Sequence, residues 1–334
     1  METLNHIKPR IAFAGAGWIG RNRMHAAKES GLAEIVMISD PAAECLEAAG
    51  RIAPKAILVP SFDAAVNDPS VDAIVIATPS ALHMQQAVQA FENGKAVFCQ
   101  KPLGRNATEV KTLIEAALKA NKLLGADFSY RYTTAFKKIH EIIQSGELGK
   151  IYAIDLVFHN AYGPGKQWFY ELELSGGGCV LDLGIHLVDL MLYALDFPEV
   201  QLVTSELYAK GIPVKGTNKV EDFADVLLHI ENDISVQLSC SWNLQAGCEA
   251  IIKASFYGTD GGVSLQNING SFYDFTALRY NGTKSEIIAQ PPDPWGGRAL
   301  VNWIKQLSAG DQFDTAAFNF LKSAQVLDRI YERQ

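Results

Sequence analysis

The chain contains no run of basic residues, and this absence limits the partners that it could bind. Its 334 residues include 29 lysines and arginines against 37 aspartates and glutamates, which gives a formal net charge of −8. The sequence pI is near 5.4. Nucleic-acid binding depends on clustered lysine and arginine that neutralise phosphates. We therefore expect no nucleic-acid partner.

Cysteine is also scarce, and its distribution argues against disulfides and metal. The five cysteines are odd in number and scattered, with no C-x-x-C pair. A disulfide framework requires an even and closely spaced set, and a structural zinc site requires paired ligands. We therefore expect no metal and a reducing compartment.

Long apolar runs are missing as well. The first residues, METLNHIKPRIAFAGAG, pass from a short polar leader into an apolar strand without the apolar core of a signal peptide. We find no apolar run long enough to span a bilayer, no internal repeat and no low-complexity segment. These absences predict a cytoplasmic protein with no membrane partner.

What the chain does contain is ample core-forming material. Hydrophobic residues make up 48% of it and charged residues 20%, a normal balance for a globular protein. A length of 334 residues allows one large domain or two ordinary ones. The pattern of apolar segments changes near residue 128 and favours two domains.

The first part of the chain alternates apolar strands with helices. RIAFAGAG (10–17) and VDAIVIATPS (71–80) predict buried strands, and ALHMQQAVQAFENG (81–94) and ATEVKTLIEAALKAN (107–121) predict helices. Continuous apolar strands between helices are typical of a parallel sheet covered on both faces. We predict an α/β domain over residues 1–127.

The second part has a different order of elements. A helix is predicted near VLDLGIHLVDLMLYAL (180–195), and several strands then follow in series between residues 200 and 290, with YGTDGGV (257–263) as a hairpin turn. Two closing helices cover residues 298–332. Strands in series favour a mostly antiparallel sheet, so we predict an α+β domain over residues 128–334.

The stretch GAGWIG (15–20) has the G-x-G-x-x-G spacing of a dinucleotide-binding turn. It follows a predicted strand and opens a predicted helix, and Asp40 ends the next strand. In such a turn Gly15 permits a tight bend, Gly17 lets the backbone approach a pyrophosphate, and Gly20 allows close packing of the helix on the strand. This context predicts a Rossmann domain; the alternative is a glycine-rich connector without a ligand.

Asp40 bears on the choice of cofactor. Its carboxylate can accept hydrogen bonds from both ribose hydroxyls and would repel a 2′-phosphate, and Pro41 rather than an arginine follows it. This favours NAD over NADP. Asp40 is also a candidate N-cap for the helix of PAAECLEAAG, with Pro41 at the first helical position, and the two roles are compatible.

Polar residues also follow the strand predicted at 71–80. Thr78, Pro79 and Ser80 stand at its C-terminal end, the edge at which doubly wound sheets hold their ligand. Ser80 is alternatively a cap of the helix that follows. His83 is equally consistent with a position facing the cofactor and with one on the helix surface.

The stretch AVFCQKPLGRN (96–106) places Lys101 at the C-terminal end of another predicted strand, directly before Pro102. An isolated lysine at such a position is most simply a solvated one, because lysine is mostly exposed. The functional interpretation therefore depends on whether other polar groups accompany Lys101.

A second group of polar residues lies in SGGGCVLDLGIHLVDL (175–190). Asp182 and His186 are four residues apart, so on a helix they share one face in a strongly apolar segment. A buried carboxylate and a buried imidazole need partners, and each could supply the other's. The alternative is a purely structural pair beside Asp189.

Together these motifs resemble the glucose–fructose oxidoreductase/inositol dehydrogenase (Gfo/Idh/MocA) family over nearly the whole chain. The resemblance rests on GAGWIG, ATPSALH, QKP, SGGG…LDLGIHLVDL and YGTDGG, in this order. It implies an N-terminal Rossmann domain, and a C-terminal α/β domain whose large open sheet forms a homodimer or homotetramer. It also implies an NAD(P)-dependent oxidoreductase acting on a sugar, inositol or related polyol.

The resemblance further assigns a catalytic role to three residues. It implies that His186 is the general base, that Asp182 orients the imidazole, and that Lys101 donates to the reacting oxygen in a cleft between the domains. The cofactor contacts that we expect are Gly15, Gly17, Trp18, Ile19, Gly20, Asp40, Thr78, Pro79, Ser80, His83, Gln100 and Lys101.

Candidate substrate contacts come from both parts of the chain. Besides the three catalytic residues they are Tyr130 and Arg131, where the chain crosses between domains, and Trp168 in the loop 161–175. The aromatic residues of that loop suit stacking on a sugar face. They are equally consistent with packing between subunits.

One residue departs from the family pattern. The family usually has Glu-Lys-Pro, whereas this chain has Gln100-Lys101-Pro102. An amide in place of a carboxylate removes an anion beside Lys101, which should lower the lysine pKa relative to the usual motif. We expect a shifted pH optimum and an activity that is retained.

Two other functions remain open from the sequence. The first is a reductase of a keto-sugar or nucleotide sugar, which uses the same groups in the reverse direction. The second is a dinucleotide-binding sensor that keeps the fold and has lost the chemistry. The presence of Lys101, Asp182 and His186 disfavours the sensor.

Overall fold

The computed structural model describes residues 8–214 and 217–333 and divides into two compact units. The first unit contains residues 1–129 and 296–321, and the second contains residues 130–295 and 322–334. The chain therefore crosses between the units near residue 130, two residues from the predicted boundary, and crosses again near residues 296 and 322.

The first unit contains a six-stranded sheet in the order β3-β2-β1-β4-β5-β6, and its paired strands are parallel. This is the strand order of a Rossmann fold, in which the carboxyl ends of β1 and β4 flank the ligand. The strands are β1 (Arg10–Ala14), β2 (Glu34–Ser39), β3 (Ile57–Val59), β4 (Ala73–Ile76), β5 (Ala96–Cys99) and β6 (Leu124–Ala126).

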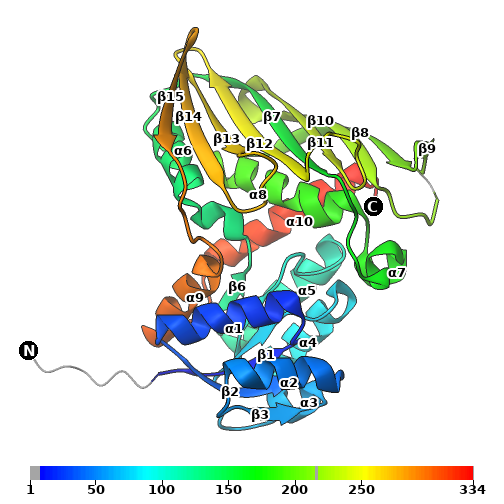
Figure 1. Ribbon diagram of the computed structural model, residues 1–334, viewed down its shortest axis with the longest axis vertical. Helices are drawn as coiled ribbons and strands as arrows, with labels where there is room; N and C mark the ends of the chain where they lie inside the picture. The colour runs from blue at the N-terminus through cyan, green and yellow to red at the C-terminus, as the bar shows by residue number, and fades with distance from the viewer. Residues whose placement is uncertain (1–7, 215–216, 334) are drawn as a thin grey trace, which may run out of the picture. The chain divides into compact units, whose positions relative to one another are not determined.

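Helices connect these strands, as the alternating pattern predicted (Figure 1). Side-chain caps begin two of them: Ser61 accepts from the backbone N–H of Asp63, and Asn106 accepts from that of Glu109. The helices are α1 (Trp18–Ser30), α2 (Ala43–Ile52), α3 (Phe62–Val66), α4 (Ser80–Glu92) and α5 (Ala107–Ala120).

The two closing helices differ from the prediction in where they belong. Helix α9 (Arg298–Ser308) lies in the first unit, whereas the sequence placed it in the second domain. Its amphipathic face explains this, because Trp303 is buried against the ring of Phe98 on β5 and against Gly125 on the edge strand β6. Helix α10 (Phe318–Ile330) begins in the first unit and ends in the second.

The second unit contains a nine-stranded sheet in the order β15-β14-β13-β12-β7-β11-β10-β8-β9. It is antiparallel as predicted, except that β7 and β11 run parallel. The strands are β7 (Ile151–Asn160), β8 (Val200–Ala209), β9 (Ile212–Pro213), β10 (Phe223–Ile230), β11 (Ile234–Ser241), β12 (Ala250–Gly258), β13 (Gly262–Asn267), β14 (Phe275–Asn281) and β15 (Lys284–Ala289).

One face of this sheet is covered by helices, and the other is open. Helix α6 (Thr134–Gln144) contacts β13, β14 and β15, and α8 (Ile185–Ala194) contacts β7 and β12 (Figure 1). Along β10 every second residue is buried on that side, while Asp225, Leu227 and His229 on the opposite side are exposed. The strand alternation therefore builds a two-layer α+β unit.

The segment 172–194 corrects one expectation from the sequence. It contains α7 (Leu172–Ser175), a π-helical turn (Val180–Gly184) and α8, and by length and composition it could cross a membrane. However, 83% of the residues in its most apolar window are buried inside the protein. Because a buried core helix passes the same test, this segment is weak evidence for a membrane span.

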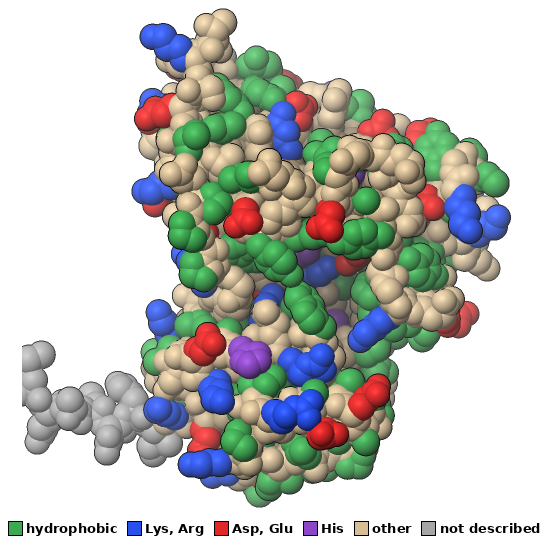
Figure 2. All heavy atoms as spheres, viewed as in Figure 1, with side chains coloured by type: hydrophobic (Ala, Val, Ile, Leu, Met, Phe, Trp, Pro, Cys, Tyr) green, Lys and Arg blue, Asp and Glu red, His purple; other side chains and the backbone are tan. Residues whose placement is uncertain are grey.

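Charged side chains of both signs are visible on one face of the molecule (Figure 2). On the face shown in Figure 2, lysine and arginine side chains are interspersed with aspartate and glutamate. This mixed pattern agrees with the absence of basic runs in the sequence.

Candidate active site

The glycine-rich turn after β1 has a geometry that only glycine suits at two positions. Gly15 has φ +93°, and a Cβ on it would lie 2.5 Å from the carbonyl oxygen of Ala77. A Cβ on Gly20 would lie 2.1 Å from the carbonyl oxygen of Gly15. The turn is therefore packed tightly against the end of β4, and the helix is packed tightly against the turn.

Helix α1 begins directly after this turn. Its N-cap residue is Gly17, which has no side chain to cap the helix, and no acidic residue lies in its first turn. Trp18 is 60% exposed, and Ile19 is partly exposed. No side chain therefore caps the first N–H groups of the helix, which lie at the positive end of its dipole. A helix start of this kind suits the binding of a pyrophosphate.

Asp40 binds the glycine-rich turn itself. One carboxylate oxygen accepts from the backbone N–H of Ala16 at 2.7 Å, and the other accepts from that of Ala42 at 2.8 Å. The N-cap of α2 is Ala42, so the predicted N-cap role of Asp40 is wrong, and so is the predicted helical position of Pro41. Asp40 instead forms an Asx turn before the helix. It also holds the glycine-rich turn after β1 (residues 15–20), called the phosphate turn below, beside the end of β2.

The position of His83 after β4 excludes one of its two alternatives. His83 is buried, and its two ring nitrogens lie 2.7 Å from the carbonyl oxygens of Thr78 and Pro102. It therefore does not lie on the helix surface but joins the loops after β4 and β5, and its contact with the cofactor stays a prediction. Burial lowers the His83 pKa, against the effect of these two hydrogen bonds.

The neighbouring residues form the beginning of α4. The N-cap of this helix is Pro79, so Ser80 is not the cap that the sequence suggested but the first helical residue. The Thr78 hydroxyl donates to the side-chain carbonyl of Gln86 at 2.7 Å. The carboxyl end of β4 thus lies beside the glycine-rich turn, and side-chain hydrogen bonds hold its Thr78.

Gln100 and Lys101 follow the carboxyl end of β5, on the same edge of the parallel sheet. The Gln100 side chain is buried, and its amide donates to the carboxylate of Asp127. Lys101 is partly exposed, and the Lys101–Pro102 peptide bond is cis. Gln100 is therefore part of a buried hydrogen-bond network with Asp127. Lys101 lies at the edge of the sheet where a cofactor would bind.

The second unit carries the aspartate and the histidine. Asp182 lies in the π-helical turn, and His186 lies in the first turn of α8. Four residues are close to one turn in either kind of helix, so both remain on one side of this segment, as predicted. Such π-turns occur frequently at functional sites.

Aromatic side chains surround this pair of residues. The ring of Tyr130 meets the His186 imidazole edge to face at 4.8 Å between centroids, and Phe158 lies 6.4 Å from the imidazole. The indole N–H of Trp242 donates to the Asp182 carboxylate at 3.2 Å. Burial, with smaller contributions from Asp182 and Tyr273, raises the pKa of the Tyr130 hydroxyl.

Arg131 has a structural role in the second unit, and its substrate contact stays a prediction. Its Nε donates to Asp189 at 2.7 Å, and a second guanidinium nitrogen forms an ion pair with the other carboxylate oxygen. The guanidinium also lies over the ring of Tyr193 at 4.4 Å from the centroid. This buried bidentate pair links the start of the second unit to α8.

The loop 161–175 packs its aromatic residues against Trp242. Trp168 stacks on Phe169 at 3.8 Å between centroids, and Phe169 and Tyr170 lie 6.3 Å and 5.6 Å from Trp242. The indole N–H of Trp168 is buried and has no acceptor among the described residues. The loop therefore reaches Asp182 through one shared side chain, that of Trp242.

The sequence analysis missed Trp242 and a second functional neighbour, Glu221. Glu221 is buried, and its carboxylate accepts from the backbone N–H groups of Gly178 and Val180 at 3.0 Å and from the Tyr331 hydroxyl at 2.7 Å. A Cβ on Gly178 would lie 1.8 Å from the Glu221 carbonyl oxygen. Glu221 therefore fixes a second glycine-rich segment, residues 176–178, which leads to Asp182.

Potential metal ligands do not cluster in the part of the chain that the structure describes. Within residues 8–214 and 217–333 there is no group of three or more His, Cys, Asp or Glu side chains that could hold a metal ion.

Solved structures of other proteins share this architecture, and two of them serve as examples. GenD2 from gentamicin A biosynthesis, in complex with NAD, has a TM-score of 0.83 at 21% identity and covers 99% of this chain and 96% of its own. KijD10, a 3-ketoreductase from Actinomadura kijaniata in complex with NADP and TDP-benzene, has a TM-score of 0.84 at 17% identity and covers 97% of both chains. These likenesses show the fold.

Sequence comparisons agree with the fold. D-glucoside 3-dehydrogenase of Escherichia coli (strain K12) is 29% identical over 205 residues, which cover 58% of each chain, so the match spans less than two thirds of that relative. Inositol 2-dehydrogenase of Acidiphilium cryptum (strain JF-5) is 26% identical over 77% of this chain and 73% of its own.

Family profiles match both halves of the chain. The profile described as "Oxidoreductase family, NAD-binding Rossmann fold" matches residues 9–128, and "GFO/IDH/MocA C-terminal domain" matches residues 136–264. These two matches follow the two units seen in the structure. The chain belongs to the Gfo/Idh/MocA family of oxidoreductases.

Proposed function

We propose that this protein is an NAD-dependent oxidoreductase that transfers a hydride between nicotinamide and a carbinol carbon of a sugar, inositol or related polyol. The observation that carries the proposal is the phosphate turn. Asp40 binds the backbone N–H of Ala16 at 2.7 Å, inside the glycine-rich turn and at the carboxyl edge of a Rossmann sheet. The proposal also rests on Lys101, Asp182 and His186, which match the family's catalytic motif.

The residues at this edge fit a dinucleotide. The uncapped start of α1 after Gly17 would bind the pyrophosphate, and Asp40 would accept hydrogen bonds from a ribose. Trp18, Thr78 and Lys101 would border the rest of the cofactor. When bound, the nicotinamide ring would accept or return the hydride.

We favour NAD over NADP because Asp40 is a carboxylate. A 2′-phosphate would meet the negative charge of Asp40 where a ribose hydroxyl would meet a hydrogen-bond acceptor. Solved structures of this fold contain NAD in GenD2 and NADP in KijD10, so the fold itself accommodates both.

The protein's own residues would carry the proton transfer. His186 would accept the proton of the substrate hydroxyl, and Asp182 would orient the imidazole and stabilise its charged form. Lys101 would donate to the reacting oxygen and stabilise the negative charge that develops on it. In the reduction of a keto-sugar the same groups would return the protons.

We also propose a homodimer or homotetramer that forms through the open face of the nine-stranded sheet. Apolar side chains on the sheet remain exposed in the single chain, including Leu202 at 50%, Ile251 at 36% and Ile287 at 59%. Exposed apolar surface of this kind is typical of an interface. A cytoplasmic location remains part of the proposal, because the cysteines are scattered and unpaired.

A panel of sugars and polyols, assayed with NAD and with NADP in both directions, tests the proposed function. The expected result is a change in nicotinamide absorbance with at least one sugar, inositol or polyol, and a higher kcat/KM with NAD. Tight binding of NAD without turnover of any member of the panel would favour the sensor instead.

A further inference from the structure

The C-terminal turn, residues 331–333, packs against the second glycine-rich segment of the second unit. The Arg333 guanidinium donates to the carbonyl oxygen of Gly176 and lies over the Tyr331 ring, 4.2 Å from its centroid. A Cβ on Gly177 would lie 2.3 Å from the Tyr331 hydroxyl. The end of the chain is therefore in direct contact with the segment that leads to the π-helical turn.

One hydroxyl connects the C-terminal turn to a buried carboxylate. The Tyr331 hydroxyl donates to Glu221 at 2.7 Å, and the same carboxylate accepts from the backbone N–H groups of Gly178 and Val180 at 3.0 Å. A buried carboxylate is costly unless hydrogen bonds replace its hydration. Each of these donors therefore helps to hold Glu221 in one position, and Tyr331 supplies the donor that comes from the C-terminus.

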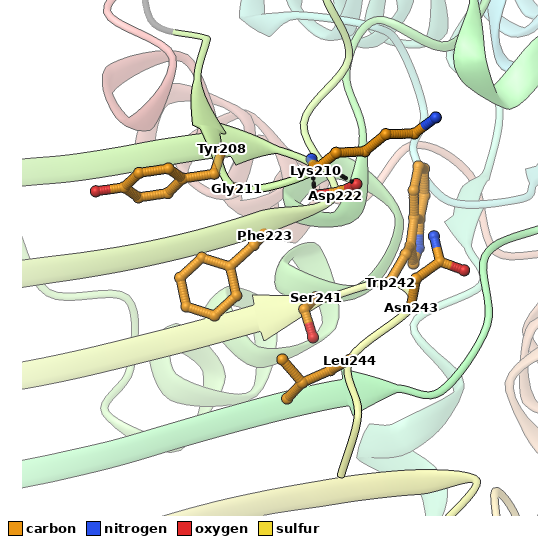
Figure 3. A pocket seen from close by; sticks show the side chains of 9 residues that line it. All are labelled: Tyr208, Lys210, Gly211, Asp222, Phe223, Ser241, Trp242, Asn243 and Leu244. Carbon is orange, nitrogen blue, oxygen red and sulfur yellow. Dashed lines mark hydrogen bonds between the residues drawn. The ribbon is translucent and has the colours of Figure 1, made fainter.

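The backbone that carries Glu221 is fixed on both sides. The neighbouring Asp222 donates its backbone N–H to the Tyr208 carbonyl oxygen at 2.9 Å and accepts from the backbone N–H of Trp242 at 2.7 Å. Figure 3 shows the Asp222 carboxylate against the backbone of Lys210, whose N–H it accepts at 3.0 Å. The loss of one hydrogen bond of Glu221 is therefore expected to move its side chain and the segment that it binds, and to leave the strand in place.

A further hydrogen bond links this arrangement to Asp182. Gly178 donates its N–H to Glu221, and its carbonyl oxygen accepts from the backbone N–H of Asp182 at 3.0 Å. The carbonyl oxygen of Glu221 also accepts from the backbone N–H of Cys179 at 3.1 Å. Three hydrogen bonds in series thus lead from the Tyr331 hydroxyl to the backbone of Asp182.

A different set of contacts anchors the end of α10. The Ser205 hydroxyl on β8 donates to the carbonyl oxygen of Ile330 at 2.6 Å, and Arg329 donates to two further carbonyl oxygens of β8. These contacts attach the helix to the sheet without the Tyr331 hydroxyl. Anchoring of the helix and contact with the glycine-rich segment can therefore be separated by substitution.

We propose that Tyr331 is a positioning residue for Asp182. Its hydrogen bond to Glu221 fixes the second glycine-rich segment, and with it the direction in which the Asp182 carboxylate faces the imidazole of His186. The inference rests on the proposed oxidoreductase function, in which Asp182 orients that imidazole, and it adds a residue from the far end of the chain. Small displacements of such a group matter, because a misplacement of about 1 Å can lower a rate on the order of a hundredfold.

The test uses three variants of the whole chain. Tyr331→Phe removes the hydroxyl and keeps the ring under the Arg333 guanidinium. Glu221→Gln interrupts the same series of hydrogen bonds, because an amide offers one acceptor oxygen where a carboxylate offers two. Ser205→Ala is the matched control, since it also removes one hydroxyl that holds the C-terminal region but leaves the donors of Glu221 in place.

Two readouts are measured on each variant. Steady-state kinetics at saturating NAD gives kcat and KM for the sugar, inositol or polyol that the wild type turns over best. The pH dependence of His186 modification by diethyl pyrocarbonate, followed by peptide mass spectrometry, gives the pKa of His186 without any turnover. Thermal unfolding shows whether each variant is folded.

We expect Tyr331→Phe to lower kcat about tenfold with little change in KM, and Glu221→Gln to act in the same direction. The pKa of His186 should fall in both variants, because a displaced Asp182 carboxylate stabilises the charged imidazole less. Ser205→Ala should leave kcat and the His186 pKa unchanged, even where its melting temperature falls.

The outcomes separate this inference from the proposed function. Unchanged kcat and an unchanged His186 pKa in folded Tyr331→Phe would overturn the inference and leave the oxidoreductase intact. An equal fall of kcat in Tyr331→Phe and Ser205→Ala would show that the hydroxyl only anchors α10, and would also overturn it. If Tyr331→Phe does not fold, the same criteria apply to Glu221→Gln.

Failure of the proposed function gives a different result. A wild type that turns over no member of the panel would contradict the oxidoreductase. A His186 pKa that falls in Tyr331→Phe but not in Ser205→Ala would then still support the positioning of Asp182, and a pKa that is the same in both would overturn it.

Discussion

The side-chain amide of Gln100 donates a hydrogen bond to the buried carboxylate of Asp127, at the position where the family usually has a glutamate. The same carboxylate forms an ion pair with Arg23 at 2.5 Å and accepts from the Ser129 hydroxyl. One anion therefore balances one buried cation, and it comes from position 127 instead of position 100. The glutamine is part of this arrangement, because an amide can donate where a carboxylate cannot.

The first prediction follows from this pair. Gln100→Glu would place a second carboxylate against Asp127, whose ion pair with Arg23 balances one negative charge, so one of the two carboxylates must bind a proton or move away. We expect the melting temperature to fall by about 5–10 °C and NAD binding to weaken. Both are measured by thermal unfolding and by fluorescence titration with NAD.

The double variant Gln100→Glu/Asp127→Asn provides the matched control. It returns one carboxylate and one amide to the network with their positions exchanged, so most of the lost stability should return. An additive effect of the two substitutions would contradict the coupling. The pH–rate profile of the double variant also tests the expected effect of residue 100 on Lys101, and a profile identical to the wild type would refute that effect.

The second prediction concerns the proposed general base. His186→Ala removes the imidazole that would accept the substrate proton, and we expect kcat to fall roughly a hundred- to ten-thousandfold. NAD affinity should change little, because the phosphate turn is built by other residues. Turnover within a few-fold of the wild type would show that another group accepts the proton.

The third prediction concerns Trp242 as a positioning residue. Trp242→Phe keeps an aromatic ring beside Phe169 and Tyr170 but removes the N–H that donates to Asp182 at 3.2 Å. A hydrogen bond to a charged group contributes roughly 1.5–3 kcal/mol, so kcat for a free sugar should fall about tenfold or more while its KM changes little. If only the melting temperature falls, the indole has a packing role alone.

The fourth prediction is a pH dependence of stability that arises from Glu221. Burial raises the pKa of the Glu221 carboxyl above its ordinary value of 4.5, against the effect of hydrogen bonds from Tyr331, Val180 and Gly178. The folded state then binds the proton more tightly than the unfolded chain does. The resulting stabilisation is complete below the ordinary pKa and is lost as pH rises through the raised one.

Glu221→Gln tests this dependence because an amide keeps a carbonyl acceptor and does not ionise. The melting temperature of the wild type should therefore fall relative to that of Glu221→Gln as pH increases from about 4.5 to 8. Glu221→Ala serves as the control, since it loses every acceptor and should be less stable than Glu221→Gln at each pH. A constant difference between wild type and Glu221→Gln would show that Glu221 does not titrate in this range.

Local patterns in the sequence were sufficient for much of the fold. The spacing of Gly15 and Gly20, with Asp40 at the end of the next strand, predicted the dinucleotide-binding turn, because that motif is a local device. The strand-to-helix alternation predicted the parallel sheet for the same reason. The three-residue strand β3 was not predicted. Its residues Ile57 and Leu58 are both exposed, so they show no alternation of buried and exposed positions.

The contacts that complete the candidate site lie far apart in the sequence. Arg23 meets Asp127 across 104 residues, and Trp242 meets Asp182 across 60. Periodicity and motif spacing carry no information on such pairs. For the same reason the sequence could not assign α9 to the first unit, because that position depends on Trp303 fitting against Gly125 and Phe98.

The fifth prediction tests the phosphate turn by comparing alanine substitutions at two glycines, one inside the turn and one outside it. Gly15 and Gly94 both have positive φ, +93° and +70°, but only at Gly15 does a Cβ meet a neighbour, the Ala77 carbonyl oxygen at 2.5 Å. Gly94→Ala should cost about 1 kcal/mol from the backbone conformation alone. Gly15→Ala carries that cost and must also move the turn away from β4, so we expect a larger fall in melting temperature and at least a tenfold weaker NAD affinity. Equal effects of the two substitutions on NAD affinity, in a fluorescence titration, would mean that the turn after β1 does not hold the dinucleotide.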